Sequence, residues 1–171
     1  MIKIPFTPFH LGVSILFIAI FPFLDPIALF VGSIIPDIEG ISAIFLFPES
    51  NLPLHGPFHS FTGSIILGTI IAIGSWGLNK ILANKSFNSP LAFIFRPYSF
   101  SQSLLSSFLG TFSHILLDAI IYPEMDLLYP LGFGNPLYGI FPFSFPYLFC
   151  VGAFFLGLII ICIKLLKRTP N

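Results

Sequence analysis

Residues 58–78 read FHSFTGSIILGTIIAIGSWGL and contain no Asp, Glu, Lys or Arg. A helix rises 1.5 Å per residue, so about 20 apolar residues cross the roughly 30 Å hydrocarbon core of a bilayer. This stretch therefore predicts a membrane-spanning helix. Residues 101–121 and 145–163 are similar runs and predict two further spans. The first of these two is apolar except for His114 and Asp118.

The composition of the whole chain agrees with a membrane protein. Of its 171 residues, 56% are hydrophobic and 8% are charged, against about 25% charged in an average soluble domain. We expect an all-α integral membrane protein with a single polytopic domain over residues 1–171. Seven basic and seven acidic residues balance to a formal charge of zero, which argues against nucleic-acid binding. Cys150 and Cys162 form no disulfide or CxxC pattern.

The N-terminal region predicts a less regular pair of segments. Residues 9–24 are interrupted by Pro22, and residues 26–35 are short. Asp25 and Pro26 are typical of a helix start, with an acceptor at the N-cap and proline at the first helical position. Pro36 is expected to end the second segment. We interpret the pair as a short helical hairpin, tilted or only partly spanning, which gives about five segments in all.

The distribution of charge predicts an orientation. Six of the basic residues fall in two regions without acids: Lys80, Lys85 and Arg96 in the loop 79–100, and Lys164, Lys167 and Arg168 at the C-terminal end. Residues 36–57 and 122–144 hold Asp37, Glu39, Glu49, Glu124 and Asp126 and no base. Basic loops stay cytoplasmic. We therefore expect a multi-pass protein of the cell (inner) membrane, with the N-terminus outside and the C-terminus cytoplasmic; Lys3 alone opposes this.

In that topology the polar residues gather on the non-cytoplasmic side. All four histidines of the chain lie there. The candidate metal ligands are His10, Asp37, His55, His59, His114 and Asp118. Imidazole nitrogens and carboxylate oxygens without thiolates favour a divalent ion such as Zn²⁺ or Mn²⁺. Six candidates exceed one tetrahedral site, so one metal with outer-sphere partners and two metals both remain open.

His114 and Asp118 give the most specific signal. Their spacing of four residues places both side chains on one face of a helix. A carboxylate inside an apolar helix is costly unless it is neutral, paired or metal-bound, and no Lys or Arg is available within the membrane. The alternative is a His–Asp hydrogen bond that joins helices. Alone, His10 also suits a capping role, and Pro57 places His55 in a loop ahead of the third segment.

A catalytic role would need an acid near the metal. A divalent metal with an open position lowers the pKa of its bound water and supplies a nucleophile at neutral pH. Glu39, Glu124 and Asp126 are the candidate proton acceptors. Their spacing does not choose among them.

The motifs also resemble a known family. FHLG at His10, SIIPDIEG at Asp37, HGPFHSF at His55 and His59, and GTFSHILLDAIIYPEMDLLYP at His114 and Asp118 are similar to the inner-membrane-associated family of predicted metal-dependent hydrolases, also described as LexA-binding. The resemblance covers about residues 7–136. It implies a membrane-bound hydrolase with a divalent metal held by these His and Asp residues. Many members have four residues between the two central histidines, where this chain has three, and Asp in place of Glu39.

Together these observations predict a metal-dependent hydrolase in the lipid bilayer. A site at headgroup depth favours a lipid or lipid-linked ester or phosphoester as substrate. Two other functions remain open: a non-enzymatic metal-binding or scaffold protein, and a small ion or proton transporter. Transport would require a polar path across the membrane, for which Asp25 is the one candidate near the inner ends of the segments. The sequence gives no indication of oligomeric state.

Overall fold

The computed structural model describes residues 7–47, 53–83 and 96–167. In these residues every regular element is helical, which confirms the expected all-α membrane fold. The helices are α1 (Thr7–Ile20), α2 (Pro26–Gly32), α3 (Ile38–Phe45), α4 (Phe61–Ala83), α5 (Phe100–Ala119) and α6 (Phe145–Leu166), with short 3₁₀ helices η1 (Ile35–Asp37) and η2 (Pro57–His59).

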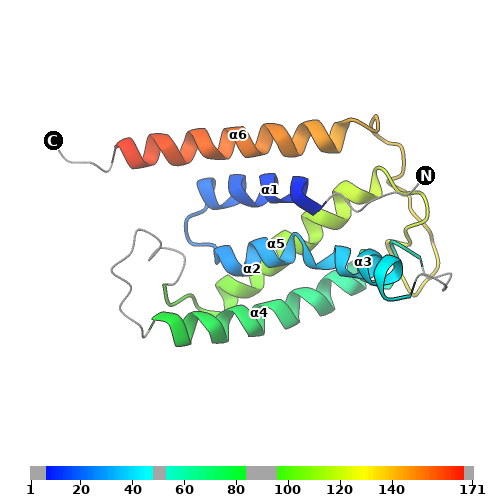
Figure 1. The fold of residues 1–171 in the computed structure, drawn as a ribbon, viewed down its shortest axis with the longest axis horizontal. Helices are drawn as coiled ribbons and strands as arrows, with labels where there is room; N and C mark the ends of the chain where they lie inside the picture. The colour runs from blue at the N-terminus through cyan, green and yellow to red at the C-terminus, as the bar shows by residue number, and fades with distance from the viewer. Residues whose placement is uncertain (1–6, 48–52, 84–95, 168–171) are drawn as a thin grey trace.

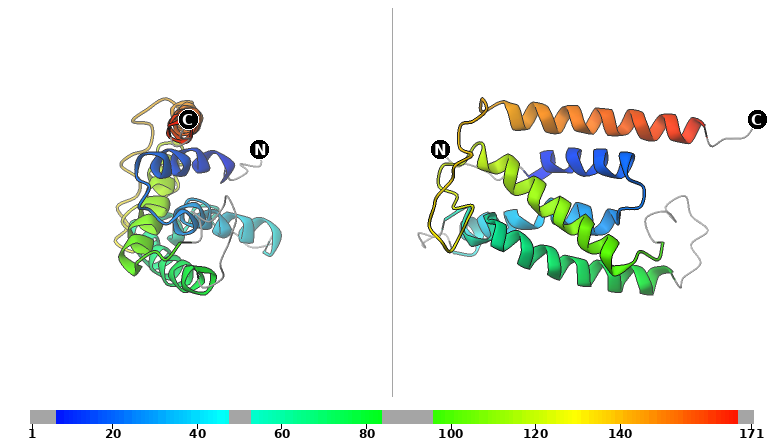
Figure 2. Two further views of the ribbon diagram at one scale, coloured as in Figure 1. Left: turned by 90° about the vertical axis from the view of Figure 1, so that its left-hand side faces the viewer. Right: turned by 180° about the vertical axis from the view of Figure 1, so that it is seen from behind.

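The longer helices run back and forth along the long axis of the molecule, whereas α3 lies across it (Figures 1 and 2). α5 crosses the middle of the bundle and packs against α2 and α4, whereas α6 packs against α1 (Figure 2). α1 begins at the end of the bundle opposite to the one where α6 ends. This path brings η1, η2 and the C-terminal part of α5 together at one end.

Within the described residues, three stretches are long and apolar enough to cross a membrane: Pro26–Phe45, Phe61–Leu82 and Phe145–Leu166. Only 17% of the last span is buried inside the molecule, so most of α6 is left to contact lipid. The expected span 101–121 is not among the three. Its helix, α5, lies at the centre of the bundle and buries a polar face that includes Ser103, Ser107 and Thr111.

The second segment begins as α2, which ends at Gly32, but further helical turns follow it. Pro36 was expected to end it, but the chain continues through η1 directly into α3. Proline at the start of a helical turn has no N–H to leave unpaired, so it can begin a turn as well as end one. Asp37 is therefore buried inside a helical path, and Glu39 lies in the first turn of α3; neither lies in a loop.

The expected helix start at Asp25 is present and forms the centre of a polar network. The Oδ1 atom of Asp25 accepts hydrogen bonds from the backbone N–H groups of Ile27 and Ala28. Its Oδ2 atom accepts from the side chains of Ser75 at 2.6 Å, Asn79 at 2.8 Å and Ser103 at 2.6 Å. These contacts satisfy a fully buried carboxylate and tie α2 to α4 and α5 at the end of the bundle far from η1.

Two glycines bring α2 and α5 into close contact. A Cβ atom added at Gly32 would lie 2.7 Å from the carbonyl oxygen of Ser107, and one at Gly110 would lie 2.5 Å from that of Leu29. Real Cβ atoms do not approach so closely, so glycine is needed at this crossing. The contact sets the distance between the η1 end of α2 and the buried face of α5.

Apart from Asp25, which is buried in its own hydrogen-bond network at the basic end, the described charges segregate between the two ends. The C-terminal ends of α4 and α6 and the start of α5 lie at one end of the bundle (Figure 1). The basic residues there are Lys80, Arg96, Lys164 and Lys167. Glu39, Glu124 and Asp126 lie at the opposite end, with η1 and η2. Lys3, Glu49, Lys85 and Arg168 lie outside the described residues. The separation matches the predicted orientation, which remains a prediction.

Candidate metal centre

Four of the six predicted ligands meet at the η1 end of the bundle. Asp37, His59, His114 and Asp118 each offer one atom to a group in which all atoms lie within 4.8 Å of one another. Asp37 comes from η1, His59 from η2, and the other two from α5. All four side chains are buried, with at most 4% of any residue exposed.

The spacing of these atoms suits a shared ion. His114 Nε2 lies 3.1 Å from Asp118 Oδ2 and 3.5 Å from Asp37 Oδ1. His59 Nε2 lies 3.8 Å from Asp37 Oδ1 and 3.9 Å from Asp118 Oδ2. Ligands about 2.0–2.2 Å from a tetrahedral Zn²⁺ are roughly 3.3–3.6 Å apart. The four atoms therefore need only small shifts to surround one metal ion.

The orientation of the two imidazoles also fits metal ligation. His114 Nδ1 lies 2.8 Å from the backbone carbonyl oxygen of Ser33, and His59 Nδ1 lies 3.1 Å from Glu39 Oε2. Both oxygens accept, so each ring carries its proton on Nδ1 when neutral. The Nε2 atoms of both rings are buried and have no hydrogen-bond partner. An imidazole that is held by a hydrogen bond at one nitrogen and turns the other toward carboxylate oxygens, as both rings do here, has the usual orientation of a metal-bound histidine.

His10 lies beside this group rather than in it. Its Nε2 atom is 3.2 Å from Asp118 Oδ1, the oxygen that does not face His59 and His114. Its ring lies against that of His114, with centroids 4.0 Å apart. In this position His10 fixes the orientation of the Asp118 carboxylate.

His55 forms a neighbouring pair with Glu124. Its Nδ1 atom lies 3.1 Å from Glu124 Oε1, and its ring stacks on Tyr122 with centroids 3.8 Å apart. The ring of His59 is 4.8 Å away, centroid to centroid. Burial lowers the pKa of His55, so the imidazole is neutral at physiological pH. Its buried Nε2 atom has no hydrogen-bond partner.

The three predicted proton acceptors have different surroundings. Glu39 is bound to the chain around the site: it accepts from the backbone N–H of Gly56 at 2.9 Å as well as contacting His59. Glu124 is the most accessible acid near the cluster, with 37% of its side chain exposed. Asp126 accepts from the backbone N–H of Gly134 at 3.2 Å, which places it in the loop after α5.

The sequence motifs did not predict two residues that contact the site, Ser33 and Tyr122. Ser33 acts through its backbone carbonyl, which leaves no mark in the side-chain pattern. Tyr122 lies four residues after Asp118, a spacing that an apolar packing residue would share. The motifs also did not distinguish the four clustered residues from His10 and His55, because membership of the cluster depends on the orientation of each imidazole ring.

The fold and this cluster define a class: an α-helical, multi-pass membrane protein with a buried His/Asp group that could hold a metal ion. Within that class, residues 7–170 match the model of the YdjM inner membrane protein family, so the chain belongs to this family. The expectation of an inner-membrane family is thereby confirmed. Searches of curated proteins and of solved structures gave no match.

Proposed function

We propose that this protein is a membrane-bound hydrolase that uses one divalent metal ion, Zn²⁺ or Mn²⁺, held by Asp37, His59, His114 and Asp118. The observation that carries the proposal is the convergence of four buried donor atoms, two of them imidazole nitrogens without a hydrogen-bond partner. Two carboxylates and two imidazoles lie within 3.1–3.9 Å of one another in this buried group, and two adjacent buried carboxylates are costly in an apolar interior unless a cation compensates them. A bound cation would remove that cost.

A divalent ion held by these four residues, with a further coordination position open to water, would supply a nucleophile at neutral pH. The chain's own residues position the ligands around it. Ser33 and Glu39 fix the two imidazoles through their Nδ1 atoms, and His10 orients Asp118. Among the candidate proton acceptors, Glu124 suits the role best because it is accessible and bonded to His55 beside the cluster. Glu39 is better suited to positioning His59, and Asp126 to ordering its loop.

The proposed substrate class is a lipid or lipid-linked ester or phosphoester. The cluster lies near the end of the bundle rather than at its middle. The segment between α5 and α6 covers that end and exposes apolar side chains, among them Leu131, Phe133 and Phe143. Aromatic and apolar groups at such a position suit the interface between headgroups and acyl chains. A site beneath them would meet substrates that lie in the bilayer.

A non-enzymatic metal-binding protein is the second candidate. The burial of all four ligands favours it, because structural metal sites are closed by protein whereas catalytic sites keep an open position. A hydrolase and a non-enzymatic protein would bind the same metal ion, but only the hydrolase would turn over a substrate.

Hydrolysis of a phospholipid panel by metal-loaded protein separates them. We expect activity in the wild type, loss of activity in His114→Ala and Asp118→Ala, and retention in Asp126→Asn, which alters an acid of the same end outside the cluster. Size-exclusion chromatography checks that each variant is folded. Metal binding without turnover on the panel would favour the non-enzymatic candidate, and full activity in both cluster variants would refute the proposed site.

A further inference from the structure

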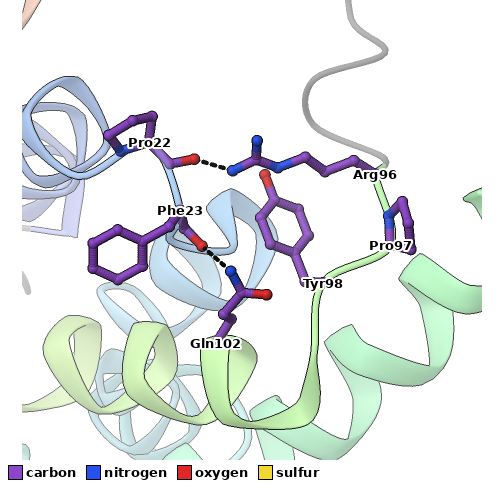
Figure 3. Close-up of a pocket in the computed structure, with 6 residues that line it drawn as sticks. All are labelled: Pro22, Phe23, Arg96, Pro97, Tyr98 and Gln102. Carbon is purple, nitrogen blue, oxygen red and sulfur yellow. Dashed lines mark hydrogen bonds between the residues drawn. The ribbon is translucent and has the colours of Figure 1, made fainter.

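A second polar site lies at the opposite end of the bundle. A pocket of about 410 Å³ is lined by Pro22, Phe23, Arg96, Pro97, Tyr98 and Gln102. Figure 3 shows that the turn between α1 and α2 forms one wall, and the residues that lead into α5 form the other. The volume is in the range of pockets that bind small ligands.

Arg96 is the charged group of this pocket. Its guanidinium donates to the backbone carbonyl of Pro22 and lies over the ring of Tyr98, 4.7 Å from the centroid. No carboxylate of the described residues pairs with it. A guanidinium has five N–H donors in a planar fork, and its contacts with Pro22 and Tyr98 do not use all five. The geometry of the fork matches the oxygens of a phosphate group.

The other groups that line the pocket are backbone carbonyls of the α1–α2 turn and the aromatic residues Phe23 and Tyr98. Gln102 donates to the carbonyl of Phe23 at 3.0 Å, which fixes the turn against the start of α5. Phe23 is 45% exposed. A cationic group beside an exposed aromatic ring suits a ligand with an anionic head and an apolar body.

The surroundings place the pocket at a membrane interface. Lys80 lies over the ring of Trp76, 3.7 Å from its centroid, and Trp76 packs edge-on against Phe100. Tryptophan and basic residues at the ends of spanning helices mark the headgroup layer. The predicted orientation assigns this end to the cytoplasmic leaflet, where anionic lipids attract basic residues.

From these observations we propose that the Arg96 pocket binds the phosphate group of an anionic phospholipid. The guanidinium would contact the phosphate, and Phe23 would contact the glycerol and the first methylenes of the acyl chains. The site is independent of the His/Asp cluster, which lies at the other end of α5.

Native mass spectrometry of the full-length protein in a neutral detergent tests this. The probes are phosphatidylglycerol, phosphatidylcholine and, separately, inorganic phosphate. We expect the wild type to retain phosphatidylglycerol in preference to phosphatidylcholine, and Arg96→Gln to bind phosphatidylglycerol about fivefold more weakly. Lys167→Gln removes a charge at the same end outside the pocket and should bind like the wild type. Phe23→Ala removes the apolar wall, keeps the Arg96–Pro22 contact, and should also reduce occupancy.

Equal weakening in Arg96→Gln and Lys167→Gln would mean a diffuse charge effect and would overturn the proposal, as would no preference for the anionic lipid. Binding of inorganic phosphate that displaces phosphatidylglycerol would overturn the assignment to a lipid. If Arg96→Gln does not yield folded protein, Phe23→Ala decides, and unchanged phosphatidylglycerol occupancy in that variant would count against the pocket.

Discussion

The backbone carbonyl of Ser33 accepts a hydrogen bond from Nδ1 of His114 across the α2–α5 interface, at 2.8 Å. A carbonyl oxygen can only accept, so the proton of the neutral ring is on Nδ1 and the lone pair is on Nε2. That Nε2 atom faces the carboxylates of Asp37 and Asp118. The packing of two helices thus determines which nitrogen of His114 is available to a metal.

Glu39 should tune metal affinity through His59. Glu39→Gln removes the carboxylate that holds His59 Nδ1 but keeps one oxygen to accept from the loop backbone. We expect a folded protein whose metal affinity is roughly 10- to 100-fold weaker, measured by competition with a chromogenic chelator. Glu124→Gln is the matched control, because Glu124 contacts His55 instead. Equal weakening in both variants would argue against a specific role for Glu39.

Close packing of α2 against α5 should be required for metal binding at the His/Asp cluster. Gly110→Ala places a Cβ atom 2.5 Å from Leu29 O and 2.9 Å from Ser33 N, so the helices must separate. We expect a loss of about 1–3 kcal/mol in stability together with reduced metal content. Gly152→Ala in α6 meets no atom within 4 Å and should be neutral. Thermal unfolding in detergent and metal analysis measure the two effects, and intact metal binding in Gly110→Ala would contradict the coupling.

The Asp25 network should contribute stability without contributing to metal binding. Asp25→Ala leaves five donors without their acceptor, three of them on the buried side chains of Ser75, Asn79 and Ser103. We expect a loss of roughly 3 kcal/mol or more, read from thermal unfolding. The chain that remains folded should bind metal normally. Asp126→Ala, which loses one loop contact, should cost less than about 1.5 kcal/mol.

His55 should make the metal-free protein sensitive to acid. Burial lowers its pKa below the usual 6.5, so below pH 6.5 the unfolded chain binds a proton that the folded chain excludes. Its contribution to stability is present above that pH and is lost as pH falls toward the folded pKa, by at most about 1.4 kcal/mol per pH unit. His55→Phe can still stack on Tyr122 and does not titrate, so its stability should fall less steeply between pH 7.5 and 5. Chemical unfolding with a chelator present measures both slopes, and parallel slopes would contradict the assignment.

The all-α membrane fold could be predicted because apolar runs of spanning length leave few other structures available. The helix start at Asp25 followed from capping chemistry, and the His114–Asp118 pair from helical spacing. The helical turns that follow α2 through Pro36, η1 and then α3, could not be predicted, because proline both ends and begins helical turns. Packing against α5 decides the outcome there.

The residues of the candidate site were recognisable as a set, but their arrangement was not. His10, His55, His59 and His114 are equivalent in the sequence, and only the rotation of each ring and its nearest oxygen distinguishes their positions. Ser33 contributes a carbonyl, which every residue has. The limit is therefore physical: side-chain patterns show which groups share an end of the bundle, whereas ligand geometry depends on helix packing and backbone contacts.

The central claim is that Asp37, His59, His114 and Asp118 hold a metal ion, and metal content by mass spectrometry tests it most directly. The comparison is between detergent-purified wild type and His114→Asn, whose amide can still donate to Ser33 O but offers no ligand at the position of Nε2. We predict stoichiometric Zn²⁺ or Mn²⁺ in the wild type and in Asp126→Asn, and none in a folded His114→Asn. A wild type that binds neither ion after reconstitution, or a His114→Asn variant that binds as much metal as the wild type, would contradict the claim.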